Sequence, residues 1–63
     1  MDDRLITVAR ACDLTSLSRT TIWRLESEGD FPRAIQIMPH RKAYRESDVR
    51  QWIASKIAAS EAA

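Results

Sequence analysis

The stretch Leu17-Ser18-Arg19-Thr20-Thr21-Ile22-Trp23-Arg24 decides the fold, because it combines a helix start with one apolar and one polar helix face. The Ser18 hydroxyl can accept a hydrogen bond from a backbone N–H two or three residues later, which makes Ser18 the best N-cap candidate in the chain. The helix would run from Arg19 to about Glu28. Gly29 would end it, because glycine adopts the left-handed conformation without a steric cost.

A shorter helix is predicted before this stretch. Thr7 can cap it, and it would end near Leu14. Residues 15–17 then form a short turn, and residues 5–8 could form the stub of a strand that leads into the helix. The order helix, three-residue turn, helix is that of a helix-turn-helix, which places its second helix in the DNA major groove.

A β-hairpin is predicted after the second helix. A strand at residues 34–38 would place Ile35 and Ile37 on one face, and a partner strand at residues 43–45 would pack Tyr44 on that same face. A proline between the two strands presets the turn. The hairpin would stand beside the helix-turn-helix as a wing.

The C-terminal part of the chain is predicted to form an amphipathic helix capped by Ser47. Its apolar residues recur at helical spacing: Val49, Trp52, Ile53 and Ile57. This stripe should close the core against the first two helices, and residues 58–63 should fray. Residues 1–63 are therefore predicted to form one mainly α domain with a small β-hairpin, a winged helix-turn-helix with an ordered core at about residues 5–57.

The charges are unevenly distributed along the chain. Ten basic and nine acidic residues give a net charge of +1, yet residues 31–45 hold four basic side chains, one histidine and no acid. The acidic residues gather elsewhere, at Asp2, Asp3, Glu26, Glu28, Asp30, Glu46 and Asp48. One face of the protein could therefore be basic, although an ordinary mixed surface fits the same charges.

Catalysis, metal binding and membrane insertion find no support in the sequence. The only histidine, His40, has no serine or aspartate placed around it as a triad requires, and a single glycine cannot make a glycine-rich phosphate loop. Cys12 is the only cysteine and lies far from His40 in sequence, so we expect neither a zinc site nor another cofactor. Without a membrane-spanning run or a secretory leader, we expect a cytoplasmic protein that is not an enzyme.

The polar face of the second helix is the candidate DNA-reading surface. Ile22 and Leu25 share the inward face, and the opposite face carries Thr20, Arg24 and Ser27. Arginine suits bidentate contact to guanine, and threonine can meet a base edge or the thymine methyl group. The same residues fit a plain solvated helix face, so periodicity alone leaves both interpretations open.

Phosphate contacts are expected at the start of the second helix, from Ser18 and Arg19, and at the hairpin turn. Trp23 lies on the flank of the helix, where it could either pack under the hairpin, the interpretation we favour, or rest against a sugar-phosphate strand. A solvated loop is the alternative for the hairpin turn. Together, the candidate DNA-binding residues are Ser18, Arg19, Thr20, Thr21, Trp23, Arg24, His40, Arg41 and Lys42.

Three ordered motifs resemble the AlpA family of phage-type regulators. Residues 17–24 are similar to the family's L-S-R-S-T-I-Y-R, Gly29-Asp30-Phe31-Pro32-Arg33 is similar to its G-x-F-P-K/R, and residues 44–53 are similar to its W-R-E-S-E-V-x-x-W-L. The resemblance covers about residues 5–57. Departures are Ser16, where the family has glycine in the turn, Met38-Pro39, where a glycine often opens the wing, Lys42, where an apolar residue is common, and Tyr44 in place of tryptophan.

The resemblance implies a winged helix-turn-helix related to MerR-type domains and to phage excisionases. It implies that the second helix and the wing bind double-stranded DNA and that the protein regulates transcription in a prophage or integrated element. Ser16 at a glycine position implies a left-handed backbone there. Unlike MerR-type dimers, the chain ends soon after Ile53, so we expect a monomer in solution that could associate on DNA.

Two other functions stay open at the level of sequence. An excisionase, a recombination directionality factor that binds repeated sites and bends DNA, would use the same fold. A protein-interaction module would grip another protein through the same helix face, and the near-zero net charge keeps that alternative open. A salt series separates them, because DNA affinity falls steeply with salt whereas an apolar protein interface weakens little.

Overall fold

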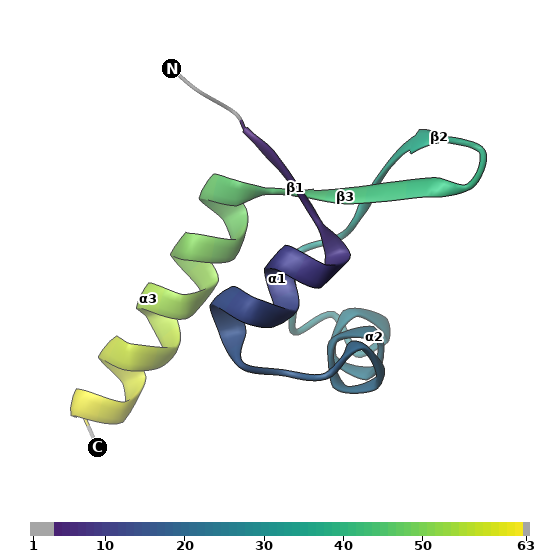
Figure 1. Cartoon of the computed structure of the whole chain (residues 1–63). Helices are drawn as coiled ribbons and strands as arrows, with labels where there is room; N and C mark the ends of the chain where they lie inside the picture. The colour runs from purple at the N-terminus through teal and green to yellow at the C-terminus, as the bar shows by residue number, and fades with distance from the viewer. Residues whose placement is uncertain (1–3, 63) are drawn as a thin grey trace.

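The computed structural model describes residues 4–62 and shows within them three helices and one three-stranded sheet (Figure 1). In chain order, the elements are β1 (Leu5–Thr7), α1 (Val8–Thr15), α2 (Arg19–Ser27), β2 (Ile35–Met38), β3 (Arg41–Arg45) and α3 (Glu46–Ala62). The acidic residues Asp2 and Asp3 lie outside the described part of the chain. The mainly helical winged helix-turn-helix that the sequence predicts is confirmed.

Two of the three predicted helix caps are present. The Thr7 hydroxyl accepts a hydrogen bond from the Arg10 backbone N–H at 3.0 Å, and the Ser18 hydroxyl accepts one from the Thr21 N–H at 3.1 Å. Each cap satisfies one of the free donors in the first turn of its helix. The Ser18 cap fixes the residue at which α2, the second helix of the helix-turn-helix, begins.

The end of α2 is a Schellman motif around Gly29. The Asp30 N–H donates to the Leu25 carbonyl at 2.8 Å, and the Gly29 N–H donates to the Glu26 carbonyl at 3.1 Å. Gly29 has a φ of 79°, the left-handed conformation that this motif requires. The helix ends at Ser27, one residue earlier than predicted, because Glu28 serves as its C-cap.

The turn between α1 and α2 contains a left-handed serine. Ser16 has a φ of 61° and a ψ of 24°, which confirms the backbone implied by the family's glycine. The Thr15 hydroxyl holds the turn on either side, donating to the Ala11 carbonyl at 2.8 Å and accepting from the Leu17 N–H at 3.4 Å. The turn therefore stores strain at a single residue.

We expect Ser16→Gly to stabilise the protein. A side chain in the left-handed region costs about 1–2 kcal/mol, and the greater freedom of glycine in the unfolded chain cancels part of that gain. The net change in the free energy of unfolding should be a few tenths to about 1 kcal/mol, measured from urea denaturation midpoints. Ser16→Ala is the control, because it keeps the Cβ atom and should give no gain. A lower midpoint for the glycine variant contradicts the prediction.

The sheet has the order β1-β3-β2, and both pairs are antiparallel. Ile6 lies opposite Tyr44 across β1 and β3, whereas Ile35 lies opposite Ala43 across β2 and β3. Adjacent residues of a strand point to opposite faces, so Tyr44 and Ile35 are on different faces, and the prediction that they share one is wrong. Tyr44 points into the core, and the β2 residues are exposed.

The core lies where α1, α2 and α3 meet the inner face of the sheet. Its buried residues are Ile6, Ala11, Ile22, Phe31, Tyr44 and Val49. Phe31 is at the centre of an aromatic cluster, with its ring edge-to-face against Tyr44 at 5.4 Å and against Trp52 at 5.0 Å between ring centroids. This cluster joins the loop after α2 to both β3 and α3.

Helix α3 follows β3 without a loop and begins at Glu46, so Ser47 lies in its first turn and the prediction that Ser47 caps it is wrong. Val49 is buried and Trp52 and Ile53 are half-buried, as the stripe predicts, but Ile57 is 53% exposed. From this point the helix extends beyond the other elements and continues to Ala62, through a segment that was predicted to fray (Figure 1). None of the helices in residues 4–62 has the length and apolar character needed to cross a membrane.

Candidate nucleic-acid interface

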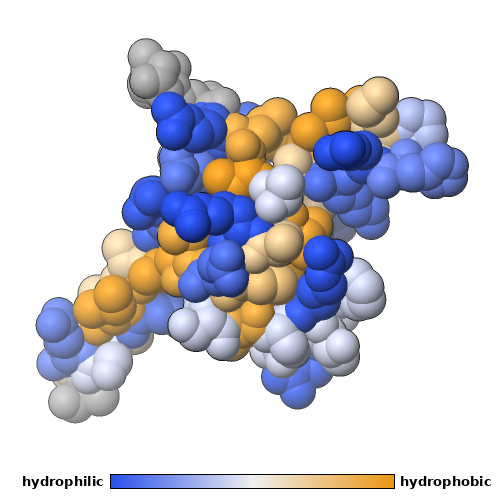
Figure 2. Space-filling view, in the orientation of Figure 1, coloured by the Kyte–Doolittle hydropathy of each residue, from blue (hydrophilic) through white to orange (hydrophobic). Residues whose placement is uncertain are grey.

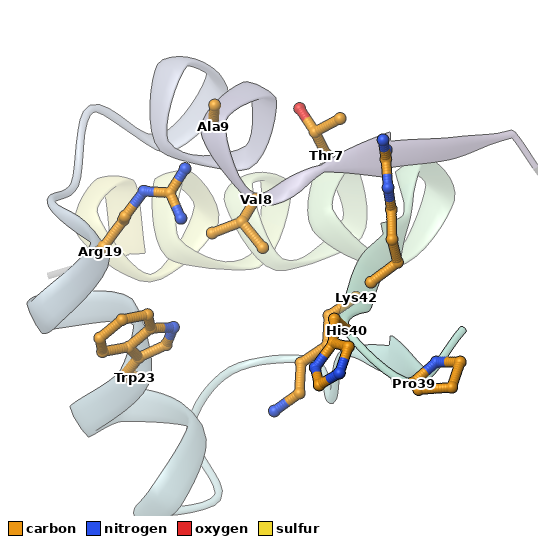
Figure 3. Close-up of a pocket in the computed structure, with 9 residues that line it drawn as sticks. Thr7, Val8, Ala9, Arg19, Trp23, Pro39, His40 and Lys42 are labelled. Atoms are coloured by element: carbon orange, nitrogen blue, oxygen red, sulfur yellow. The ribbon is translucent and has the colours of Figure 1, made fainter. Parts of the chain in front are cut away.

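A groove of about 650 Å³ separates the hairpin turn from the first half of α2 (Figure 3). Its lining comes from three places that are distant in sequence: the start of α1, the outer side of α2 and the hairpin. The lining residues are Thr7, Val8, Ala9, Arg19, Trp23, Pro39, His40, Arg41 and Lys42. Five of the nine predicted DNA-binding residues are therefore brought together in one groove.

The charge of this groove is of one sign. Arg19, Arg41 and Lys42 are exposed cations, His40 lies beside them, and among residues 4–62 no acidic side chain lines the groove. In Figure 2, hydrophilic residues cover the outer end of the hairpin, and apolar residues lie along β2 between that end and the body of the domain. A cleft lined by like charges focuses the electrostatic field and attracts ligands of the opposite sign. The groove thus favours an anion.

Trp23 faces this groove from α2 and is 56% exposed. The prediction that it packs under the hairpin is therefore wrong, because the hairpin stands away from α2 on the far side of the groove (Figure 3). The same indole also borders a second hollow of about 390 Å³, together with Glu26, Ser27, Arg33 and Lys42. A large aromatic ring exposed between basic side chains is available to contact a ligand.

The other four predicted residues lie outside the groove, Ser18 as the N-cap of α2 and the other three on the helix itself. The hydroxyls of Ser18 and Thr21 bond to each other at 2.9 Å, so both take part in the start of the helix. Thr20 and Arg24 are exposed on the face opposite the buried Ile22. These two side chains point outward from the helix and are free to meet a surface laid against it.

Sequence reasoning missed two contributors to this surface. The start of α1 lines the groove beside the hairpin, which no pattern within α1 indicates. Arg33 borders the second hollow. It could have been found from its position in the acid-free run of residues 31–45, directly before the hairpin.

Glu26 connects α2 to the hairpin beneath these hollows. Its Oε2 atom accepts a hydrogen bond from the Ala34 N–H at 2.7 Å, and its Oε1 atom accepts one from the Tyr44 hydroxyl at 3.2 Å. Burial of the phenol, together with the negative charge of Glu26 and the hydrogen bond to it, raises the pKa of Tyr44 to about 12. Tyr44 is therefore neutral, a hydrogen-bond donor, across the physiological range.

We expect Tyr44 to titrate near pH 12 in the folded protein and near pH 10 in urea. Because the folded pKa is the higher one, the stability due to the neutral phenol is complete below pH 10 and is lost as the pH rises towards 12. Tyr44 is the only tyrosine, so phenolate absorbance reports it directly. Glu26→Gln should lower the midpoint only in part, since burial remains. A folded midpoint near 10 contradicts the prediction.

A helix-turn-helix flanked by a β-hairpin, with a basic groove between the two, defines a winged helix-turn-helix protein. The chain belongs to the family of the prophage CP4-57 regulatory protein (AlpA), whose sequence pattern matches residues 4–57. The description of the family names a regulatory role.

The chain is also similar to a phage protein. It is 34% identical over 56 residues to the uncharacterized protein ORF88 of Enterobacteria phage P4, an alignment that covers 89% of this chain and 64% of that protein. The chain thus spans less than two thirds of the length of this relative.

Proposed function

We propose that this protein binds double-stranded DNA at a specific sequence and regulates transcription in a prophage or integrated element. Helix α2 enters the major groove and the hairpin lies on the adjacent backbone. The proposal rests on one observation above all, the basic groove in which Arg19, Trp23 and the hairpin turn face one another. Membership in a family of prophage regulators supports the regulatory role.

In this proposal, different residues around the groove contact bases and phosphates. Arg24 and Thr20 read base edges, because they are exposed on the outward face of α2. Arg19, Arg41 and Lys42 hold phosphates on either side of the groove, where contacts position the protein without reading sequence. The exposed ring of Trp23 packs against a sugar-phosphate strand that runs between them.

The dimensions of α2 suit this arrangement. An α-helix with its side chains is about 10–12 Å in diameter, which fits a major groove about 12 Å wide, and the nine residues of α2 lie roughly 13 Å along it. The hairpin turn lies across the protein groove from the side chains of Arg19 and Trp23 (Figure 3). A phosphate strand beside the major groove can therefore be held from both sides at once.

Replacing both Arg41 and Lys42 with alanine should weaken binding to specific and scrambled duplexes alike. Each lost phosphate contact should reduce the slope of log K against log salt by about 0.9. The slope is measured by fluorescence-anisotropy titrations across a salt series. The matched control is Arg50→Ala with Lys56→Ala, which removes the same charge from α3, away from the groove. A slope equal to that of the control would show that the hairpin turn does not touch DNA.

A further inference from the structure

Glu26 is an acidic side chain at the junction of α2 and the hairpin, and it borders the hollow shared by Trp23 and Lys42. We propose that Glu26 is a positioning residue, which sets the hairpin at a fixed distance from α2 so that both can engage one DNA duplex. The inference rests on the proposed DNA-binding function and adds a residue that does not itself touch DNA.

The Glu26 carboxylate links α2 to the hairpin through two hydrogen bonds. It is half-buried in the last turns of α2, and each carboxylate oxygen accepts a hydrogen bond from a different part of the hairpin. The Ala34 N–H belongs to the residue before β2, and the Tyr44 hydroxyl belongs to β3. One side chain therefore links α2 both to the segment that enters β2 and to β3.

Glu26 matters here because few close backbone contacts link α2 to the hairpin. In the described part of the chain, β3 lies close to β1, β2, α1 and α3, and α2 lies close to α1, whereas α2 and β3 meet through the buried core cluster that contains Ile22 and Tyr44. A groove separates Trp23 and Arg19 from the hairpin turn. Without Glu26, the position of Lys42 relative to α2 would depend on the sheet and on the core cluster that contains Ile22 and Tyr44.

The chemistry of the pair favours a carboxylate. Both partners are donors, and an ionised carboxylate is an acceptor at both oxygens. Hydrogen bonds to a charged acceptor are about twice as strong as neutral ones. Replacing Glu26 by alanine leaves the Ala34 N–H and the Tyr44 hydroxyl without this acceptor, and the hairpin then gains freedom relative to α2. Ordering this freer hairpin on DNA costs conformational entropy, which lowers the affinity for DNA.

The first test is amide hydrogen exchange of the full chain without DNA, comparing Glu26→Ala with Glu28→Ala. Glu28 is an exposed acid two residues away, so the control removes the same charge beside the same helix. We expect faster exchange at Ala34 and in β2 and β3 of Glu26→Ala, with α1 and α3 unchanged. A general loss of stability would instead accelerate all the elements together. Hairpin exchange equal to that of the control overturns the proposal.

The second test is the salt dependence of binding to the specific duplex. We expect the slope of log K against log salt for Glu26→Ala to fall below that of Glu28→Ala by between about 0.9 and 1.8, which is one or two phosphate contacts. Alanine at Arg41 and Lys42 should then cost less affinity in the Glu26→Ala background than in the wild type, because the two changes act on one element. Additive effects and an unchanged slope overturn the proposal, whatever the exchange result.

Two further variants keep the test decisive. Glu26→Gln retains one acceptor for the Ala34 N–H and an amide that can donate to the Tyr44 oxygen, so it should restore most of the slope. If Glu26→Ala fails to fold, Tyr44→Phe removes one of the two hydrogen bonds without changing the charge.

If the Arg41 and Lys42 variant itself shows the wild-type slope, the proposed hairpin contact fails, and the coupling to DNA fails with it. If the Arg41 and Lys42 variant shows the expected loss of slope while Glu26→Ala keeps the slope of Glu28→Ala, only the role of Glu26 is overturned.

Discussion

Trp52→Ala is expected to unfold the domain or to leave it only marginally stable. The indole packs edge-to-face against Phe31 with 5.0 Å between ring centroids, and its Nε1–H donates to the Asp30 carbonyl at 2.6 Å. Lys56 extends over the same ring, 5.5 Å from its centroid, and pairs with Asp30 at 3.5 Å. The side chain therefore fastens α3 to the loop that follows α2.

The expected cost of this truncation is about 3 kcal/mol, the lower end of the range for aromatic residues, because the ring is half-buried. A domain of this size has roughly 3–5 kcal/mol of stability in total. Thermal denaturation followed by circular dichroism measures the effect. Ile57→Ala is the control on the same helix, and we expect a change within about 0.5 kcal/mol because that side chain is exposed. A cooperative melt shifted by only a few degrees for Trp52→Ala would place the indole outside the core.

Arg24→Ala is expected to remove most of the sequence preference and leave the fold intact. Arg24 is exposed on the face of α2 opposite Ile22, so its loss leaves no cavity. One bidentate contact to guanine contributes about 1–3 kcal/mol of discrimination, which is roughly a fivefold to a 150-fold loss of affinity for the correct site. Binding to scrambled duplexes should change little.

Titrations on specific and scrambled duplexes at one fixed salt concentration measure this preference. Arg50→Ala removes the same charge from the exposed side of α3, where Arg50 pairs with Glu46 at 3.2 Å, and it should leave the preference unchanged. An equal loss of affinity on both duplexes would assign Arg24 to phosphate binding. A changed melting temperature would instead assign it a role in the fold.

Much of the local structure could be predicted from the sequence. The Thr7 and Ser18 caps, the Gly29 helix end and the left-handed Ser16 are each fixed by interactions within a few residues. Steric limits on the backbone and hydrogen bonds to the nearest free N–H groups do not depend on the rest of the chain. The family motifs then fixed the order of these elements, because each motif spans one helix boundary or one turn.

Apart from the Ser47 cap, which fails because α3 begins at Glu46 directly after β3, the predictions that failed concern contacts between distant segments. Tyr44 faces the core and Ile35 does not, because β3 pairs with β1 in a register that no local pattern specifies. Trp23 is exposed because the hairpin stands away from α2, and Ile57 is exposed because α3 extends beyond the other elements. A periodic pattern shows which residues share a face, and only packing shows whether anything covers that face.

The candidate site divides in the same way. The sequence by itself determined that residues 31–45 are basic and that α2 presents Thr20 and Arg24 on a polar face, since composition and helical spacing are properties of the chain. Only the tertiary structure brought Arg19, Trp23 and the hairpin turn to one groove and placed Glu26 between Ala34 and Tyr44. These groups are far apart along the chain, and their distances are set by how the helices and the sheet pack around Ile22, Tyr44 and Val49.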